Sequence, residues 1–277
     1  MTELTEYQNK IIELGMEIIR KYSLLYLMLK TRTGKTPISL KIAEQISNEV
    51  LFITTKKMLA QLPNEVSKFD IKANVTGFSM DSLHKIKEFK GIIIVDEAHA
   101  FGSYTNRTGC KRQKELKRIA GDNKIIFLSA TPTPESWSQI YYQLAVTKYS
   151  PFAEWINFYK WCKEFVNVKK KYLGAIQCND YSEAKIDKIK PYIEPISISL
   201  TQEQAGFKFA NTCDTIINIK FANETKEIFN SLLKDSIYDD GFIEVVADSA
   251  AMLLSKLHQL CGGTIIDSER NKHFVDL

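Results

Sequence analysis

Short, almost wholly apolar runs recur through the first half of the chain, and a polar cluster follows each one. The runs lie at 24–29, 50–53, 92–95 and 124–128. Runs of this length without alternation are typical of strands in a parallel sheet that is buried on both faces. Stretches between them carry apolar residues at helical spacing, as at Tyr7, Ile11, Leu14 and Ile18. The pattern predicts an α/β fold with a central, mainly parallel sheet flanked by helices.

The first run leads directly into Lys30-Thr31-Arg32-Thr33-Gly34-Lys35-Thr36, and a helical pattern follows. Strand, turn and helix in this order are the context of a phosphate-binding P-loop. The fit is imperfect, because Leu29 replaces the first glycine of the full pattern and Arg32 stands where many related loops have glycine. A bare Gly-Lys-Thr also arises by chance at a helix start with a solvated lysine, but its place after a buried strand favours the P-loop.

The chemistry of this loop follows from its expected geometry. Backbone N–H groups of the turn and of the helix N-terminus point at phosphates. Lys35 supplies a point charge to the outer phosphates, and the Thr36 hydroxyl can bind Mg²⁺. The loop therefore predicts ATP and Mg²⁺ as cofactors.

The run 92–95 ends in Asp96-Glu97-Ala98-His99, and the rest of the chain is organised around this stretch. In open α/β sheets, ligands bind just beyond the carboxyl ends of the strands. Asp96 and Glu97 therefore stand where a magnesium–nucleotide complex could lie. A strand can also end in acids simply to begin a solvated loop, so the upstream P-loop decides between the two interpretations.

The run 124–128 ends in Ser129-Ala130-Thr131-Pro132, a further polar cluster at a strand end. Turn chemistry could explain any one of these clusters. For all four clusters in this order, coincidence is improbable.

Together these motifs resemble those of superfamily 2 helicases and translocases, in the Swi/Snf-type, chromatin-remodeller-like branch. The resemblance rests on Tyr7-Gln8, Thr33–Thr36, Asp96–His99 and Ser129–Pro132. It extends more loosely to Thr201–Phe207 and Leu257–Leu260, which are similar to compact phage-type members. It implies an N-terminal RecA-like P-loop NTPase lobe over residues 1–150, and an ATP hydrolase of helicase or translocase type.

The resemblance implies roles for the nucleotide site. Gln8 would hydrogen-bond the adenine edge, since its amide both donates and accepts. The phosphates would be held by Thr33, Gly34, Lys35 and Thr36. Asp96 would anchor Mg²⁺ through water, and Glu97 would orient or deprotonate the attacking water. A lone glutamine such as Gln8 could equally be an exposed helix residue.

The resemblance also implies how the nucleotide state reaches nucleic acid. Coupling between the two would run through His99, Ser129 and Thr131. Contacts to the phosphates of one strand would come from Thr54, Thr55, Lys56, Phe78 and Ser79. Lysines of this kind are more often a solvated face, so the nucleic-acid assignment is weaker than the phosphate chemistry. The expected partner is nucleic acid, with DNA favoured.

Beyond Ser150 the character changes, and residues 151–277 are interpreted as a mainly helical accessory segment with strands returning to the sheet. Aromatic residues crowd 152–165 and are followed by Lys169-Lys170-Lys171. Such a pattern can bind nucleic acid, but docking of the aromatics on the core with solvated lysines is the better interpretation. Strands are expected at Ile196–Leu200 and Asp214–Phe221, and helices at Glu224–Lys234 and Ile243–Leu260.

A second RecA-like lobe with an arginine that reaches the γ-phosphate is not recognisable in the sequence. We therefore expect a longer chain or a partner protein to supply it. Hydrolysis by this chain alone should be slow, since such an arginine can be worth about 10³-fold or more.

Composition limits the remaining possibilities. The net charge of +4 is too mild to identify a nucleic-acid partner by itself. The five cysteines are scattered without ligand spacing, which predicts reduced thiols and no structural zinc. No apolar stretch suits a membrane span or a secretory signal, so a cytoplasmic location and no membrane partner are expected.

Two other functions stay open at this stage. The lobe could serve as a nucleotide-gated scaffold that binds nucleic acid or protein with little hydrolysis of its own. A small-molecule phosphotransferase is disfavoured, because it gives no account of Asp96–His99 or of Ser129–Pro132.

Overall fold

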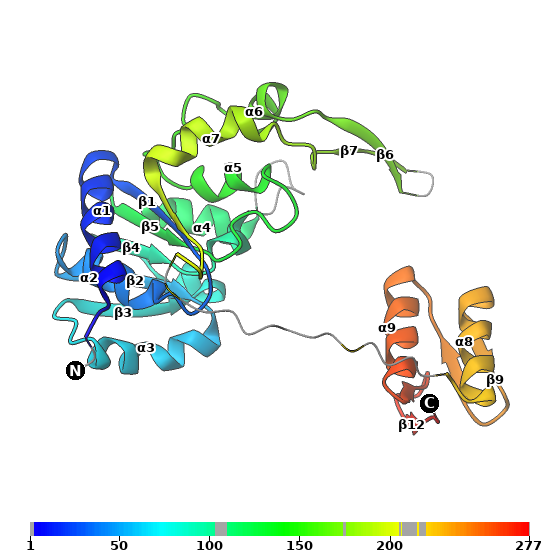
Figure 1. The fold of residues 1–277 in the computed structure, drawn as a ribbon. Coiled ribbons are helices and arrows are strands. Elements are labelled where there is room, and N and C mark those ends of the chain that lie inside the picture. Colours follow the sequence, from blue (N-terminus) through cyan, green and yellow to red (C-terminus); the bar gives the residue numbers. More distant parts are fainter. Residues whose placement is uncertain are drawn as a thin grey trace. The chain divides into compact units, whose positions relative to one another are not determined.

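The chain folds into two compact units, residues 1–209 and 210–277 (Figure 1). The computed structural model describes residues 3–102, 110–173, 176–204, 206, 215 and 220–276. The boundary at residue 209 separates two compact structural units. The functional segments expected at 1–150 and 151–277 stay a prediction.

A six-stranded sheet forms the centre of the first unit. Its strands are β1 (Leu24–Leu29), β2 (Glu49–Thr54), β3 (Asn74–Ser79), β4 (Ile92–Val95), β5 (Lys124–Leu128) and β8 (Ser197–Leu200). They lie in the order β3-β2-β4-β5-β1-β8, and all neighbouring pairs are parallel. The predicted α/β fold with a mainly parallel, RecA-like sheet is confirmed.

Helices cover both faces of this sheet (Figure 1). One face carries α1 (Glu6–Tyr22), α2 (Lys35–Glu44) and α3 (Lys56–Lys68). The other carries α4 (Lys111–Ala120), α5 (Gln139–Leu144), α6 (Phe158–Phe165), α7 (Ile186–Ile193) and the 3-10 turn η1 (Met80–Lys85). Two shorter 3-10 turns, η2 (Ala98–Phe101) and η3 (Glu194–Ile196), follow β4 and α7.

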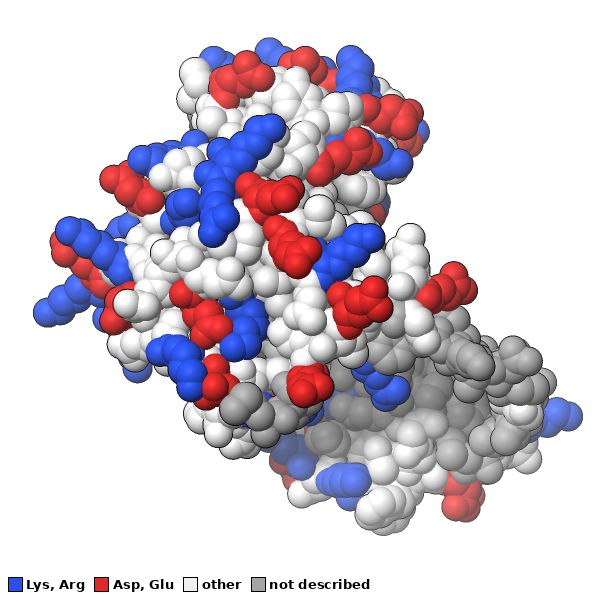
Figure 2. Space-filling model, turned by 60° about the vertical axis from the view of Figure 1, so that its left-hand side comes forward, with Lys and Arg blue, Asp and Glu red and all other residues white. Residues whose placement is uncertain are grey.

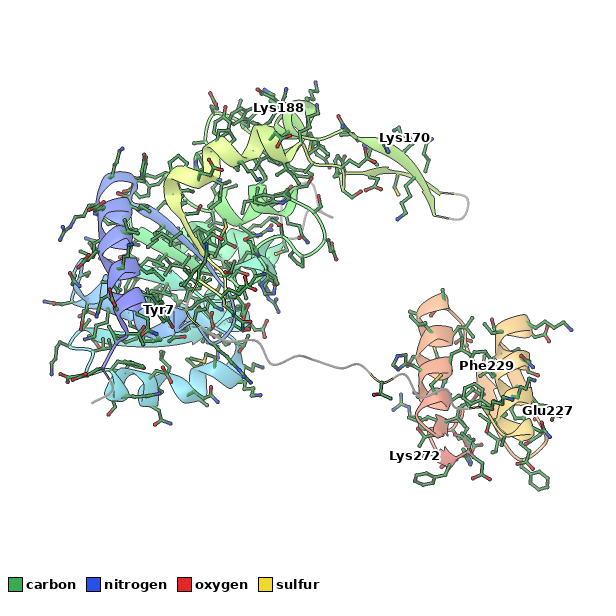
Figure 3. The ribbon with its side chains drawn as sticks, in the orientation of Figure 1. Tyr7, Lys170, Lys188, Glu227, Phe229 and Lys272 are labelled. Carbon is green, nitrogen blue, oxygen red and sulfur yellow. The ribbon has the colours of Figure 1, made fainter. Side chains whose placement is uncertain are left out.

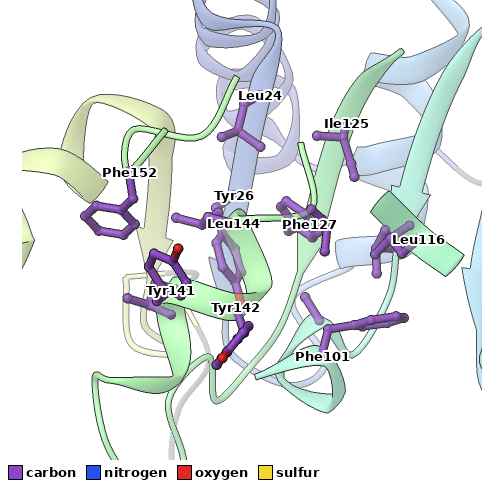
Figure 4. Packing of buried hydrophobic residues seen from close by; sticks show 14 of the residues in the cluster. Leu24, Tyr26, Phe101, Leu116, Ile125, Phe127, Tyr141, Tyr142, Leu144 and Phe152 are labelled. Atoms are coloured by element: carbon purple, nitrogen blue, oxygen red, sulfur yellow. The ribbon is translucent and has the colours of Figure 1, made fainter. Parts of the chain in front are cut away.

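The apolar runs are continuous because both faces of each central strand are buried. In β1, Leu24 and Tyr26 pack with α4 and α5, whereas Leu25 and Leu27 pack with α1 and α2. All four side chains are fully buried. Figure 4 shows the first of these packing layers, in which Tyr26 lies among aromatic and aliphatic side chains. Burial on both sides fixes the strand register, and with it the position of every loop at the strand ends.

The aromatic stretch docks on the core, as expected from helical spacing. Phe152, Phe158, Trp161 and Phe165 are at most 2% exposed and pack against Tyr141 and one another. The three lysines that follow lie in the strand β6 (Lys169–Leu173), which pairs with β7 (Ile176–Asp180). This hairpin extends away from the sheet, with Lys170 on it (Figure 3). Buried rings cannot stack on bases, so these four aromatic residues are part of the fold.

The expected strand at Ile196–Leu200 is present as β8, which pairs with the free side of β1. Its alternating sequence suits an edge strand, since Ile198 and Leu200 pack inward on the α1 face. Most of the second expected strand, Asp214–Phe221, lies outside the described residues.

The second unit has its own small core. It contains α8 (Asn223–Asp235), β9 (Ile237–Asp239), β10 (Glu244–Val246), α9 (Ala250–Cys261), β11 (Thr264–Ile266) and β12 (Lys272–Phe274). Ile228, Leu232, Val245 and Leu260 are buried there. The helix expected at Ile243–Leu260 is wrong at its start. Its β-branched opening pairs with β9 instead, and Ser249 caps α9 by accepting from Met252 N.

The aromatic cluster makes a stability prediction. Phe165→Ala should lower the free energy of unfolding by about 3–5 kcal/mol, because it leaves a cavity among fixed rings. Urea denaturation followed by circular dichroism measures the change. The matched control is Ile156→Ala, whose side chain is 79% exposed and which should change stability by less than about 0.5 kcal/mol. Equal effects of the two substitutions would contradict the packing described.

Candidate active site

The three motif-bearing loops leave adjacent strands at the same edge of the sheet. β4, β5 and β1 are neighbours, with Ile94 opposite Ile126 and Tyr26 opposite Phe127. Because all three strands are parallel, Asp96, Ser129 and Lys30 follow strand ends that lie together. Open α/β sheets bind ligands just beyond the carboxyl ends of their strands, which is where these three loops lie.

The carbonyl groups of the P-loop are held by side chains, which leaves its N–H groups turned elsewhere. Thr31 O accepts from Gln202 Nε2 (3.0 Å), and Thr33 O accepts from Tyr7 Oη (3.1 Å) and Gln8 Nε2 (3.3 Å). Lys30 O accepts from Thr33 Oγ1 at 2.7 Å. A peptide's N–H points opposite to its carbonyl, so the N–H groups of Thr31, Arg32 and Gly34 point away from these partners.

Those N–H groups have no acceptor in the described part of the chain. The N–H groups of Arg32, Thr33 and Gly34 donate no hydrogen bond to any described residue. They precede the N-terminus of α2, where backbone N–H groups and the helix dipole favour an anion. The loop has the chemistry of a phosphate cradle.

Two residues of the P-loop have left-handed backbone conformations. Gly34 has φ of 84° and Arg32 has φ of 65°. A Cβ on Gly34 would lie 2.2 Å from Gln8 Nε2, so another residue here would displace the Gln8 amide and strain the left-handed backbone. Arg32 has a left-handed conformation that glycine adopts without strain but that a side chain makes costly.

Lys35 lies on the same loop, partly buried. Its Nζ donates to Leu29 O at 3.1 Å and to Lys30 O at 3.4 Å. Burial lowers the pKa of the ammonium, and the negative charges of Glu97 and Asp96 act against that shift. Lys35 and the two carboxylates therefore share one electrostatic site.

Gln8 lies against this loop from the first turn of α1 and follows Tyr7, which is labelled in Figure 3. Its Oε1 accepts from Thr5 N at 2.9 Å, while its Nε2 donates to Thr33 O. Both halves of the amide are engaged by the protein. The predicted contact with an adenine edge would require it to exchange these bonds, and it stays a prediction.

Asp96 is held by a residue for which another role was predicted. Thr54 Oγ1 donates to Asp96 Oδ2 at 2.8 Å, and the Thr54 side chain is fully buried. Thr54 therefore has no surface for nucleic acid, and its hydroxyl orients the carboxylate instead. The other oxygen of Asp96, Oδ1, makes no hydrogen bond to a described residue.

Glu97, His99 and Ser129 form a chain of contacts between β4 and β5. His99 Nδ1 lies 3.2 Å from Glu97 Oε2 and 3.1 Å from Ser129 Oγ. Ser129 Oγ also accepts from Thr131 N at 3.2 Å. Glu97 has φ of 48° and ψ of 48° and is 41% exposed, so a strained backbone presents its carboxylate to solvent. The coupling role stays a prediction, but the three residues are in contact.

The donor set at this edge fits a magnesium ion. Mg²⁺ prefers hard oxygen ligands and usually keeps several waters. Thr36, half-buried at the start of α2, offers a hydroxyl, and Asp96 offers the oxygen that Thr54 leaves free. Elsewhere, the described ranges contain no group of three or more His, Cys, Asp or Glu side chains placed to hold a metal ion. Nor does any helix in those ranges have the length and apolarity to span a membrane.

A comparison with protein families decides what this site belongs to. The model of the SNF2-related domain matches residues 19–263, most of the chain. The chain belongs to the SNF2-related domain family. A comparison with curated proteins gave no match at a significant level. The match confirms the Swi/Snf-type resemblance and places the chain among ATP-dependent ATPase domains of helicase or translocase type.

The SNF2-related domain also has a cavity next to Glu97 and His99. It is an open cavity of about 660 Å³ lined by Thr55, Lys56, Lys57, Ser79, Met80, Asp81, Glu97, His99, Ala100 and Arg112. Thr55, Lys56 and Ser79 were predicted nucleic-acid contacts, and the structure brings them together. Phe78 is half-buried next to Ser79, at the end of the edge strand β3.

Three residues of the SNF2-related domain that support the site were not predicted from the sequence: Tyr26, Gln143 and Gln202. Buried Tyr26 donates to Gln143 Oε1, and Gln143 Nε2 donates to Pro132 O at 2.6 Å, which ties β1 to the Ser129–Pro132 loop. Burial raises the pKa of Tyr26, so its hydroxyl stays a neutral donor. Gln202, which follows Thr31 by 171 residues in the sequence, donates a hydrogen bond to the P-loop. Only the loose resemblance at Thr201–Phe207 pointed to this last residue.

Thr54→Val tests the role of Thr54. The substitution keeps the shape but removes the donor to Asp96, and loss of such a supporting hydrogen bond costs about 10-fold or more in metal affinity. We expect the Mg²⁺ concentration for half-maximal turnover to rise by about that factor. Thr55→Val, at the exposed N-cap of α3, is the control and should leave the Mg²⁺ dependence unchanged. Weaker binding of nucleic acid by Thr54→Val with normal Mg²⁺ dependence would contradict this role.

Proposed function

We propose that this chain is the ATP-hydrolysing half of a nucleic-acid translocase or helicase, completed by a second RecA-like lobe. The observation that carries the proposal is the P-loop, whose carbonyls are engaged by side chains while its N–H groups face outward. Such a loop, beside Lys35 and two carboxylates, suits a nucleoside triphosphate. The family supports the same class of activity.

The residues of the site divide the work of hydrolysis. The N–H groups of Arg32, Thr33 and Gly34, with the Lys35 ammonium, bind and orient the phosphates. Mg²⁺, held by Thr36 and Asp96, would neutralise charge that develops on the transferred phosphate. Glu97 is exposed and lies where a carboxylate can orient a water molecule and accept its proton.

The contacts of His99 offer a route by which ATP hydrolysis affects bound nucleic acid. His99 touches Glu97 on one side, and it lines the cavity that contains Lys56 and Lys57. Arg112 borders the same cavity and is oriented by its ion pair with Asp81 at 2.6 Å. We place the phosphates of a bound strand over this cavity. The face seen in Figure 2 carries interspersed positive and negative side chains. We therefore assign nucleic-acid binding to the local group of basic side chains at this cavity.

The second lobe, the preference for DNA and the cytoplasmic location are parts of the proposal that rest on the family and on the sequence. Without an arginine from a second lobe, turnover by this chain should be slow. The rival function is a nucleotide-gated scaffold that binds a partner and hydrolyses little. Its support is the partial exposure of Glu97, which a scaffold would tolerate.

Glu97→Gln separates the two functions. The amide cannot accept a proton, so turnover should fall by about 10²–10⁴-fold while the affinity for ATP changes little. Phosphate release and equilibrium nucleotide binding measure the two quantities. The matched control is Glu115→Gln on α4, which pairs with Arg118 away from the P-loop and should keep normal turnover. Unchanged turnover in Glu97→Gln would favour the scaffold.

The nucleic-acid surface is tested by the salt dependence of binding. Each lysine that contacts a phosphate adds about one to the slope of log affinity against log salt. Replacing Lys56 and Lys57 by alanine should reduce this slope by about two for duplex or single-stranded DNA. The control replaces Lys188 and Lys190, exposed on α7 (Figure 3), and should leave the slope unchanged. An equal reduction in both pairs would show that the cavity is not the binding surface.

A further inference from the structure

Gln202 reaches the P-loop from the turn that follows β8. Its Nε2 donates to Thr31 O at 3.0 Å and lies 3.3 Å from Thr31 Oγ1. The neighbouring residue of the loop is tied to the same segment, since Lys30 N donates to Leu200 O at 3.3 Å. The parallel pairing of β1 with β8 is thus continued beyond the sheet into the phosphate loop.

The turn that carries Gln202 does not need its side chain. Thr201 N donates to Gln204 Oε1 at 3.0 Å, and Gln204 N donates to Thr201 Oγ1 at 3.2 Å. These two bonds close the turn on their own. The amide of Gln202 is therefore available for the P-loop rather than for local structure.

The bond from Gln202 acts on the peptide between Thr31 and Arg32. In a planar trans peptide the carbonyl and the N–H point in opposite directions. With Thr31 O held by Gln202, the N–H of Arg32 faces away from Gln202, where the structure offers it no acceptor among the described residues. In this orientation of the peptide, Arg32 has a left-handed φ of 65°. A free peptide would tend to rotate and relieve the strain at a residue with a side chain.

We propose that Gln202 is a positioning residue of the nucleotide site. It holds the Thr31 carbonyl, keeps Arg32 in its left-handed conformation, and so presents the Arg32 N–H to a phosphate of the bound nucleotide. The inference rests on the proposed nucleotide site.

The chain offers a matched set of variants for testing the clamp. Gln202→Ala removes the donor, and Gln202→Glu keeps the shape but brings an acceptor to a carbonyl. Gln204→Ala is the control, because it disturbs the same turn without touching the P-loop. The readouts are affinity for a fluorescent ADP analogue with Mg²⁺, and melting temperature.

Both Gln202 variants should bind the ADP analogue about tenfold more weakly, the size expected for one well-placed hydrogen bond. Their melting temperatures should stay within about 2 °C of that of the unmodified protein, because the Gln202 side chain is only partly buried. Gln204→Ala should bind the analogue normally. A general structural role for Gln202 would instead lower the melting temperature with no selective loss of affinity.

A double-mutant cycle with Arg32→Gly tests the mechanism. Glycine adopts the left-handed conformation without strain, so the clamp is less needed. Removing Gln202 should then weaken binding by clearly less than tenfold in the Arg32→Gly background. An equal loss in both backgrounds would overturn the proposed link between Gln202 and Arg32.

If the unmodified chain binds no nucleotide, the proposed function is overturned and this inference falls with it. If the unmodified chain binds the analogue and the Gln202 variants bind it equally well, the clamp alone is overturned.

Discussion

The register of three parallel strands, β4, β5 and β1, is the constraint on which the whole site depends. Each is buried on both faces, and a shift by one residue would exchange the packing of every side chain between the two cores. The cost of that exchange fixes where each strand ends. Because the strands are parallel neighbours, the P-loop, the Asp96–His99 segment and the Ser129–Pro132 loop are brought to the same end of the sheet.

A small set of buried polar contacts then adjusts what the sheet has positioned. Thr54 orients Asp96, and Tyr26 together with Gln143 ties β1 to the loop after β5. Such groups are costly to bury unless they are paired, so their hydrogen bonds are specific as well as favourable. The side chains that hold the P-loop carbonyls do the same work at the surface, where they leave the N–H groups without an acceptor among the described residues.

The sequence predicted the fold well for a physical reason. Unbroken apolar runs such as Ile92–Val95 have few structural solutions, and motifs at their ends must share an edge of the sheet. It was wrong about the start of α9, where the β-branched residues before Ser249 pair with β9 instead of continuing a helix. It also missed Gln202 and misjudged Thr54, because their roles depend on tertiary contacts with Thr31 and Asp96 that no local pattern records.

The central claim is that the P-loop and the strand-end carboxylates form one magnesium–nucleotide site. A crystal structure of the chain with Mg²⁺ and a slowly hydrolysed ATP analogue tests it most directly. The account predicts phosphate oxygens on the N–H groups of Arg32–Lys35 and a metal ion between Thr36 and Asp96. Phosphates bound elsewhere, or a metal ion that contacts neither residue, would contradict it.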